Sequence, residues 1–197
     1  MSTVSALQKA RAAYQPKLPP VFNSQAMTIS VSEGAPTESV GDQAAVRGMF
    51  PNTYGLPEVT FEPSSDPLVP AEPLKVGVIL SGGQAPGGHN VIAGLFDGLK
   101  ALHPDNELLG FLGGPSGLLD NQYVVFDDET INAYRNTGGF DIIGSGRTKL
   151  ESHDHFATVV ENCKALGVSA LIVIGGDDSN TNACLLAEYC LQQDADI

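Results

Sequence analysis

Short apolar runs alternate with longer segments of helical periodicity from Leu74 to the end of the chain. The short runs stop at glycine or acidic residues and predict buried strands. We expect these strands at 75–80, 106–112, 123–126, 140–143 and 170–174, with a loop at 115–122. The longer segments predict helices, and the alternation is typical of an α/β fold with a mostly parallel sheet covered on both faces. We expect these helices at 90–102, at 129–136, from a cap at Ser152 to Gly167, and at 181–192.

Residues 1–72 differ from the remainder because prolines recur at short intervals between positions 16 and 73. Proline interrupts helices and central strands, so only short elements are expected there. We expect an amphipathic helix within 1–14 and a brief strand at 27–31. We interpret residues 1–72 as an extension that wraps over a domain or mediates assembly, and a disordered linker is the alternative. Residues 73–197 then form the folded α/β part.

The stretch 170–186, ALIVIGGDDSNTNACLL, concentrates the candidate chemistry. Two glycines follow a strand that we expect to be buried on both faces, and Asp177 and Asp178 come next. Side-chain oxygens at 179–181 are suited to cap the following helix. The N–H groups at a helix start bind phosphate oxygens, and a carboxylate binds Mg²⁺. The sequence therefore predicts a site for a polyphosphate and a metal ion, with an ordinary acidic loop as the alternative.

Two further glycine-rich segments follow predicted strands: SGGQAPGGHN after Leu80 and GSGRTKLE after Ile143. Neither standard nucleotide motif fits the first, because Gly88 stands where a Walker A box needs lysine and Ala85 interrupts G-x-G-x-x-G. We interpret it as an atypical phosphate loop. The second holds Arg147 and Lys149, which fits a phosphate clamp, although a solvated loop arginine is the alternative. All three glycine-rich loops are expected at the same sheet edge, where the carboxyl ends of parallel strands meet.

The net charge of −13 excludes two classes of partner. Such a charge repels nucleic acids and anionic membranes, and no apolar run approaches the length of a membrane span. It also repels phosphates, so a phosphate ligand needs local donors and a divalent cation. The N-terminus has no apolar signal region, although its basic residues leave a transit peptide open. The three cysteines fall in predicted helices without a C-x-x-C pair, which argues against a zinc site and favours the reducing cytoplasm.

Three segments together carry a family resemblance: VILSGGQAPGGHN, GGFDIIGSGRTKLE and LIVIGGDDSNTNACLLAE. They resemble the N-terminal part of pyrophosphate-dependent phosphofructokinases, and the similarity is greatest to the long-chain type that includes the plant catalytic beta subunit. The segments KARAAYQPKLP and MFPNTYGLP resemble the N-terminal extension of that type. The resemblance implies a phosphofructokinase-type three-layer sandwich, of which residues 73–197 are the N-terminal, truncated part of the catalytic domain.

The resemblance also implies roles for individual residues. In the family, the loop carrying Gly82 and Gly83 contacts the phosphoryl donor, the arginine matching Arg147 binds its phosphates, and the acid matching Asp177 holds Mg²⁺. Relatives that use ATP have glycine at the position of Asp178, where a carboxylate repels the α-phosphate of ATP. Asp178 is thus expected to set donor specificity. The diphosphate-binding residues implied are Gly82, Gly83, Arg147, Gly176, Asp177, Asp178 and Ser179.

The implied activity is reversible transfer of a phosphoryl group from pyrophosphate to fructose 6-phosphate in glycolysis. The alternatives are an ATP-dependent 6-phosphofructokinase, which only Asp178 disfavours, and a non-catalytic regulatory subunit, which the intact GGDDS and GSGR loops disfavour. The family's P-K-T-x-D-G-D stretch with the catalytic base does not occur in this sequence. We therefore expect this chain to be an N-terminal fragment that is inactive alone, and the full-length form to be a homo- or hetero-oligomer.

Overall fold

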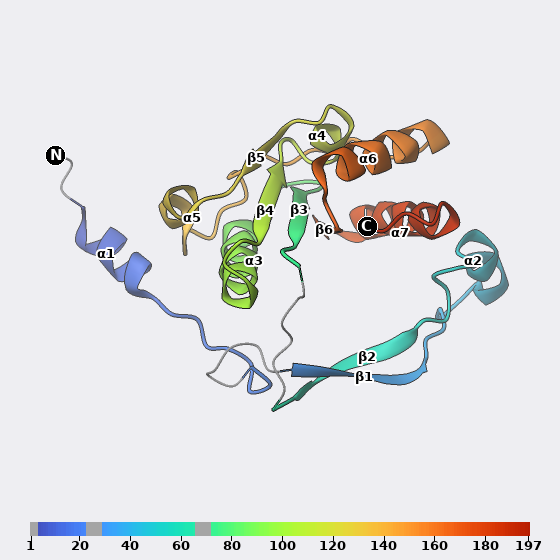
Figure 1. Cartoon of the computed structure of the whole chain (residues 1–197), viewed down its shortest axis with the longest axis horizontal. Coiled ribbons are helices and arrows are strands. Elements are labelled where there is room, and N and C mark those ends of the chain that lie inside the picture. Colours follow the sequence, from blue (N-terminus) through green and yellow to red (C-terminus); the bar gives the residue numbers. More distant parts are fainter. Residues whose placement is uncertain (1–3, 23–28, 66–71) are drawn as a thin grey trace.

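The computed structural model of the protein describes residues 4–22, 29–65 and 72–197. Its main sheet has four strands in the order β5-β4-β3-β6 (Figure 1). Strands β3 (Lys75–Leu80), β4 (Glu107–Phe111) and β6 (Ala170–Ile174) are parallel, and β5 (Tyr123–Val125) runs antiparallel to β4. A separate antiparallel ribbon pairs β1 (Ile29–Pro36) with β2 (Pro57–Pro63). The predicted α/β class with a mostly parallel sheet is confirmed.

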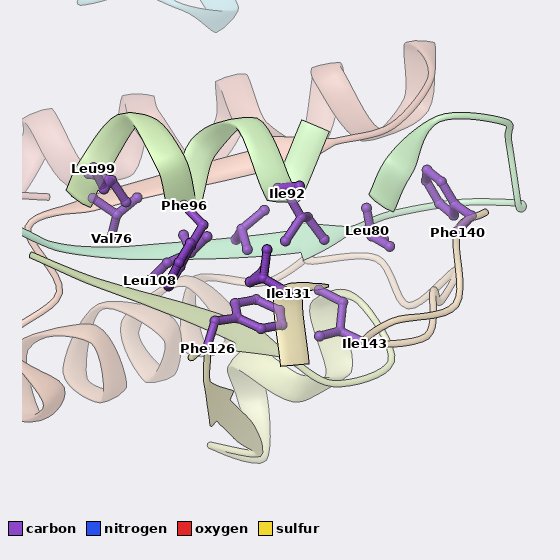
Figure 2. Packing of buried hydrophobic residues seen from close by; sticks show 12 residues of the cluster. Val76, Leu80, Ile92, Phe96, Leu99, Leu108, Phe126, Ile131, Phe140 and Ile143 are labelled. Atoms are coloured by element: carbon purple, nitrogen blue, oxygen red, sulfur yellow. The ribbon is translucent and has the colours of Figure 1, made fainter. Parts of the chain in front are cut away.

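Helices cover both faces of the main sheet because alternate residues of β3 point to opposite sides. On one face, Val76, Val78 and Leu80 pack with α3 (Gly88–Leu102) and α5 (Asp128–Tyr134). Figure 2 shows Ile92, Phe96 and Leu99 of α3 lying along this strand. On the other face, Ile79 belongs to a second apolar cluster that includes side chains of α4 (Pro115–Leu119), α6 (His153–Leu166) and α7 (Asp177–Gln192). The sheet is therefore the middle layer of three.

Helix ends follow local sequence signals in several places. The Ser152 side chain accepts a hydrogen bond from the His155 N–H at the start of α6, and Gly167 ends that helix with a left-handed φ of 71°. Asp127 caps α5 by accepting from the Thr130 N–H. The three cysteines lie in helices as expected, and all are free.

Four local expectations are wrong. Residues 140–143 form bends instead of a strand, and residues 115–119 form helix α4 where a loop was expected. Helix α7 begins at Asp177 and not at Thr181, so the oxygens at 179–181 lie inside the helix and do not cap it. Strand β6 is half-buried along its length and not buried on both faces, because it pairs only with β3 and forms an edge of the sheet.

Hydrogen bonds join the N-terminal residues that the structure describes to the α/β part. Helix α1 (Ala6–Ala13) is shorter than expected, and the carbonyl groups of Arg11 and Tyr14 accept hydrogen bonds from the Asn136 side chain. Helix α2 (Gln43–Met49) leads to a turn whose Asn52 and Thr53 bind Glu188 of α7. The strand expected at 27–31 corresponds to the start of β1, while residues 27 and 28 lie outside the described residues.

Within the described ranges, the helices are too short or too polar for any of them to cross a membrane.

Candidate functional site

A cavity of about 450 Å³ lies at the carboxyl ends of β3 and β6, beside the start of α7. This edge cavity is lined by Ser81, Gly82, Gly83, Arg147, Thr148, Lys149, Gly176, Asp177, Asp178, Ser179 and Asn182. The lining includes all seven residues that the family resemblance assigned to diphosphate binding. The three glycine-rich loops therefore meet at one edge of the sheet, as predicted, although the loop with Arg147 follows bends and not the strand expected at 140–143. The chemical roles of these residues stay predictions.

The start of α7 places two carboxylates at the cavity. Asp177 and Asp178 occupy the first turn of the helix, and both are exposed. Gly176 precedes this turn and supplies no side-chain cap. Uncapped N–H groups in a first helical turn bind water or an anion. The helix start thus combines acids that suit a cation with backbone donors that suit a phosphate.

Ser179 connects the first turn of α7 to the loop after β3. It is buried, and its hydroxyl group donates to the hydroxyl oxygen of Ser81 at 2.9 Å. The Ser179 side chain also lies so close to Gly175 that a Cβ there would be only 2.5 Å from it. Glycine at position 175 therefore lets the strand end pass the helix start closely. The bond between Ser179 and Ser81 joins α7 to the loop after β3.

Arg147 extends over the loop that follows β3. A Cβ built on Gly83 would lie 2.9 Å from Nη2 of Arg147, so glycine at this position leaves room for the guanidinium group. Gly82 has a left-handed φ of 95°, which favours glycine. Its N–H donates to the Gly146 carbonyl oxygen at 2.7 Å. That N–H therefore holds the two loops together and does not face a ligand.

The structure adds supports that sequence motifs did not reveal. Asn182 of α7 accepts from the Leu150 N–H at 2.8 Å and donates to the Leu150 carbonyl oxygen at 2.6 Å. This pair fixes the chain just after the Arg147 loop, which we define as residues 144–149. On its other side, the Gly113 N–H donates to the Ile143 carbonyl oxygen at 2.8 Å. These partners lie 30 or more residues apart in the chain, so no local sequence signal reveals them.

The charges in the edge cavity are balanced locally although the chain is strongly acidic. Arg147 and Lys149 supply two positive charges, and Asp177 and Asp178 supply two negative ones. In the part of the chain that the structure describes, no three or more His, Cys, Asp or Glu residues gather to form a metal cage. Mg²⁺ is commonly held by one or two carboxylates together with substrate phosphates and waters. The donor set therefore fits Mg²⁺ arriving with a phosphate ligand.

Comparison with known proteins gives one family. The phosphofructokinase family profile matches residues 75–194. A pyrophosphate–fructose 6-phosphate 1-phosphotransferase of Porphyromonas gingivalis is 53% identical over 193 residues, which cover 98% of this chain and 34% of that protein. The beta 1 subunit of the Arabidopsis thaliana enzyme is 46% identical over 187 residues, covering 95% and 32%. The chain thus spans about a third of the length of these relatives.

The fold agrees with this assignment. A solved structure of a pyrophosphate-dependent phosphofructokinase from Nitrosospira multiformis matches with a TM-score of 0.55 at 20% identity, covering 62% of this chain and 31% of that one. At this level of identity the match shows the fold alone. Together with the profile match over more than half of the sequence, these findings place the chain in the phosphofructokinase family.

Proposed function

We propose that this chain forms the pyrophosphate-binding part of a phosphotransferase that acts reversibly on fructose 6-phosphate. The phosphoryl group moves from pyrophosphate to the 1-hydroxyl oxygen of the sugar phosphate. A new P–O bond forms there, the P–O bond to the leaving phosphate breaks, and the hydroxyl proton passes to a general base. One observation carries this proposal: the edge cavity brings Arg147 and Lys149 together with the two aspartates at an uncapped helix start. The names of relatives that are 46–53% identical support the same reaction.

Arg147 and Lys149 bind the phosphates of the donor. A guanidinium group presents parallel donors that match phosphate oxygens, and the clearance at Gly83 keeps this group above the loop. The N–H groups in the first turn of α7 supply further hydrogen-bond donors, which the backbone holds in fixed positions. These fixed donors stabilise the negative charge that develops on the leaving phosphate, which is where most catalysis of phosphoryl transfer arises.

Asp177 holds Mg²⁺ in this proposal. Its carboxylate is exposed at the cavity, and a hard divalent cation prefers such oxygen ligands. When bound, Mg²⁺ neutralises charge on the donor phosphates. This neutralisation matters here because the chain's net charge of −13 repels pyrophosphate.

Asp178 excludes ATP. A nucleotide donor would bring its α-phosphate to the side of the cavity where this carboxylate stands, and like charges repel. An ATP-dependent phosphofructokinase is the second candidate, because the repulsion by the Asp178 carboxylate is the single feature that disfavours ATP. A non-catalytic subunit is less well supported, because it has no need of an arginine and an acid placed together.

The assembly and the compartment belong to the same proposal. The name of the Arabidopsis thaliana relative, a beta subunit, supports a homo- or hetero-oligomer. The three free cysteines in helices support a reducing compartment such as the cytoplasm.

The test uses a completed enzyme, a chimera in which this chain replaces the matching third of the Porphyromonas gingivalis relative. We expect turnover of fructose 6-phosphate with pyrophosphate and little with ATP. Arg147→Met should raise KM for pyrophosphate by about 10- to 100-fold, the size of a lost charge-assisted hydrogen bond. Lys75→Met is the matched control, because Lys75 pairs with Glu107 at the opposite end of β3. Preference for ATP would overturn the choice of donor, and tight pyrophosphate binding without turnover would favour the non-catalytic subunit.

A further inference from the structure

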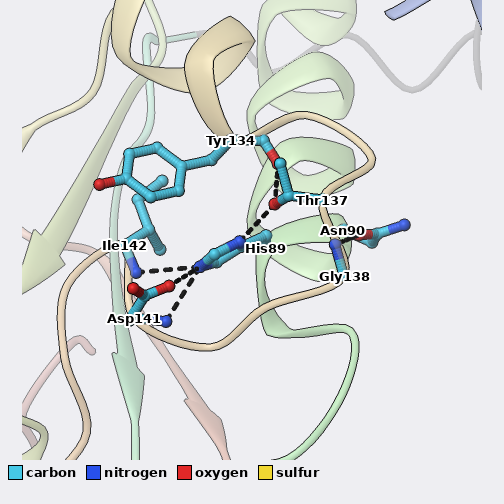
Figure 3. Close-up of polar contacts among 7 residues, drawn as sticks. All are labelled: His89, Asn90, Tyr134, Thr137, Gly138, Asp141 and Ile142. Carbon is cyan, nitrogen blue, oxygen red and sulfur yellow. Dashed lines mark hydrogen bonds and ion pairs between the residues drawn. The ribbon is translucent and has the colours of Figure 1, made fainter. Parts of the chain in front are cut away.

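We propose that His89 is a positioning residue that holds the Arg147 loop in place as a neutral imidazole. His89 lies in the first turn of α3 and is only 3% exposed. His89 belongs to the SGGQAPGGHN segment but does not line the edge cavity, and its side chain points to Asp141 and Ile142, just before the Arg147 loop (Figure 3). The inference rests on the proposed function only in naming pyrophosphate as the ligand of that loop.

The hydrogen bonds of His89 select one tautomer. Its Nε2 lies 2.9 Å from the backbone nitrogen of Asp141 and 3.0 Å from that of Ile142. Backbone N–H groups only donate, so Nε2 must accept and carries no proton. Nδ1 lies 2.5 Å from the Thr137 hydroxyl oxygen, and this hydroxyl donates its own hydrogen to the Tyr134 carbonyl oxygen. All of these bonds are satisfied together only when Nδ1 carries the hydrogen.

His89 acts through a short length of backbone. The N–H groups of Gly87 and His89 donate to the carbonyl oxygens of Gly138 and Gly139, at 2.8 and 2.9 Å. The start of α3 therefore fixes residues 138–142 through both backbone and side chain. The same segment continues directly into the Arg147 loop, whose Gly146 carbonyl accepts from Gly82. A shift at 141–142 moves the loop that carries the guanidinium group.

Protonation would reverse this role. An imidazolium would direct an N–H from Nε2 at two groups that also only donate, and would favour the Asp141 carboxylate, whose Oδ1 lies 2.9 Å away. Tyr134 also faces the ring, edge-on, with centroids 4.9 Å apart. Burial lowers the pKa of His89 below its ordinary 6.5 and outweighs the charge and hydrogen bond of Asp141, which raise it.

The direction of the pH effect follows. A histidine whose pKa is lower in the folded state takes up its proton first in the unfolded chain. The contribution of His89 is therefore complete above pH 6.5 and is lost as the pH falls from 6.5 through the lowered pKa. We expect acid to release residues 141–147 before the enzyme unfolds globally.

Three variants of the completed enzyme test the proposal by hydrogen exchange of peptides spanning 140–150, corrected for intrinsic rates. His89→Leu should reduce protection about tenfold at pH 8 and raise KM for pyrophosphate about tenfold, leaving KM for fructose 6-phosphate unchanged. His89→Gln offers an amide oxygen near the position of Nε2 and does not ionise. It should keep the protection and lose its acid dependence. Asp141→Asn removes a charge that raises the pKa, so release should move to lower pH.

The proposal is overturned if His89→Leu keeps full protection, if His89→Gln loses as much as His89→Leu, or if Asp141→Asn leaves the midpoint unchanged. Should His89→Leu fail to fold, the other two variants decide. His89→Gln keeps a polar side chain at the buried position, and Asp141→Asn alters only an exposed side chain. The exchange measurement contains no pyrophosphate. If the variants show the expected exchange but the enzyme does not bind pyrophosphate, the positioning role is supported and the proposed function is refuted.

Discussion

Glu188→Ala should release the turn at residues 52–53 from α7. The Glu188 side chain is only 3% exposed, and its carboxylate accepts from the backbone N–H groups of Asn52 and Thr53 and from both of their side chains. These contacts join residues about 135 positions apart, and they fix the N-terminal part of the chain to the helix that carries the site acids. Removing the carboxylate leaves every one of these donors without its charged acceptor.

The expected loss can be worked out from the donors. The amide and hydroxyl side chains can turn to water, but the two backbone N–H groups cannot leave without moving the turn. Each hydrogen bond to a charged group contributes about 1.5–3 kcal/mol, so the two together contribute about 3–6 kcal/mol to docking of the turn. Water that enters after release offsets part of this. Because about 1.4 kcal/mol changes an equilibrium constant tenfold, a loss of about 3 kcal/mol corresponds to about a 100-fold loss of protection from exchange.

Hydrogen exchange of peptides covering residues 50–55 in the completed enzyme measures this loss. Glu161→Ala is the matched control, because it removes the same charge from an exposed position of α6. The helix core should keep its protection in both variants. An increase in exchange no greater than that of the control would refute the assignment of docking energy to Glu188.

Four further outcomes are expected. Asp178→Gly should raise the ratio of kcat/KM for ATP to that for pyrophosphate at least about fivefold, the size of one like-charge contact at 4 Å in water; an unchanged ratio would remove Asp178 as the donor gate. Asp177→Asn should keep the fold, because the residue is exposed, and lower Mg²⁺-dependent turnover by about 100-fold; turnover near the unsubstituted rate would contradict its role. Burial raises the pKa of Glu188, but the bonds from Asn52 and Thr53 outweigh it and hold the pKa below 4.5, so exchange at 50–55 should increase only as the pH falls below 4.5. The 197-residue chain by itself should be inactive and self-associate through the free edge of β6, and monodisperse material in light scattering would disprove the association.

Local signals in the sequence were sufficient to locate several helices and strands. The apolar runs at 75–80 and 170–174 match β3 and β6 residue for residue, and Ser152 and Gly167 bound α6 as their cap chemistry predicts. The convergence of the loops after β3 and β6 also followed from sequence, because loops after parallel strands open on one edge. The Arg147 loop lies at the same edge although no strand precedes it. For these features, the deciding interactions lie within a few residues or follow from topology.

Distant partners decided the remainder. Residues 140–143 have a strand's composition, but the Asp141 and Ile142 N–H groups bind His89 and so are not available to a neighbouring strand. Ser179 has the chemistry of a cap, but its hydroxyl group binds Ser81, and α7 begins earlier at Asp177. The sequence gives no sign that Glu188 differs from a surface acid, but in the structure the turn at 52–53 covers it. Sequence alone determined the four strands of the main sheet, the caps of α6 and the sheet edge where the candidate site lies. Tertiary structure decided how each polar group is used, because a donor or acceptor binds whichever partner the fold brings within reach.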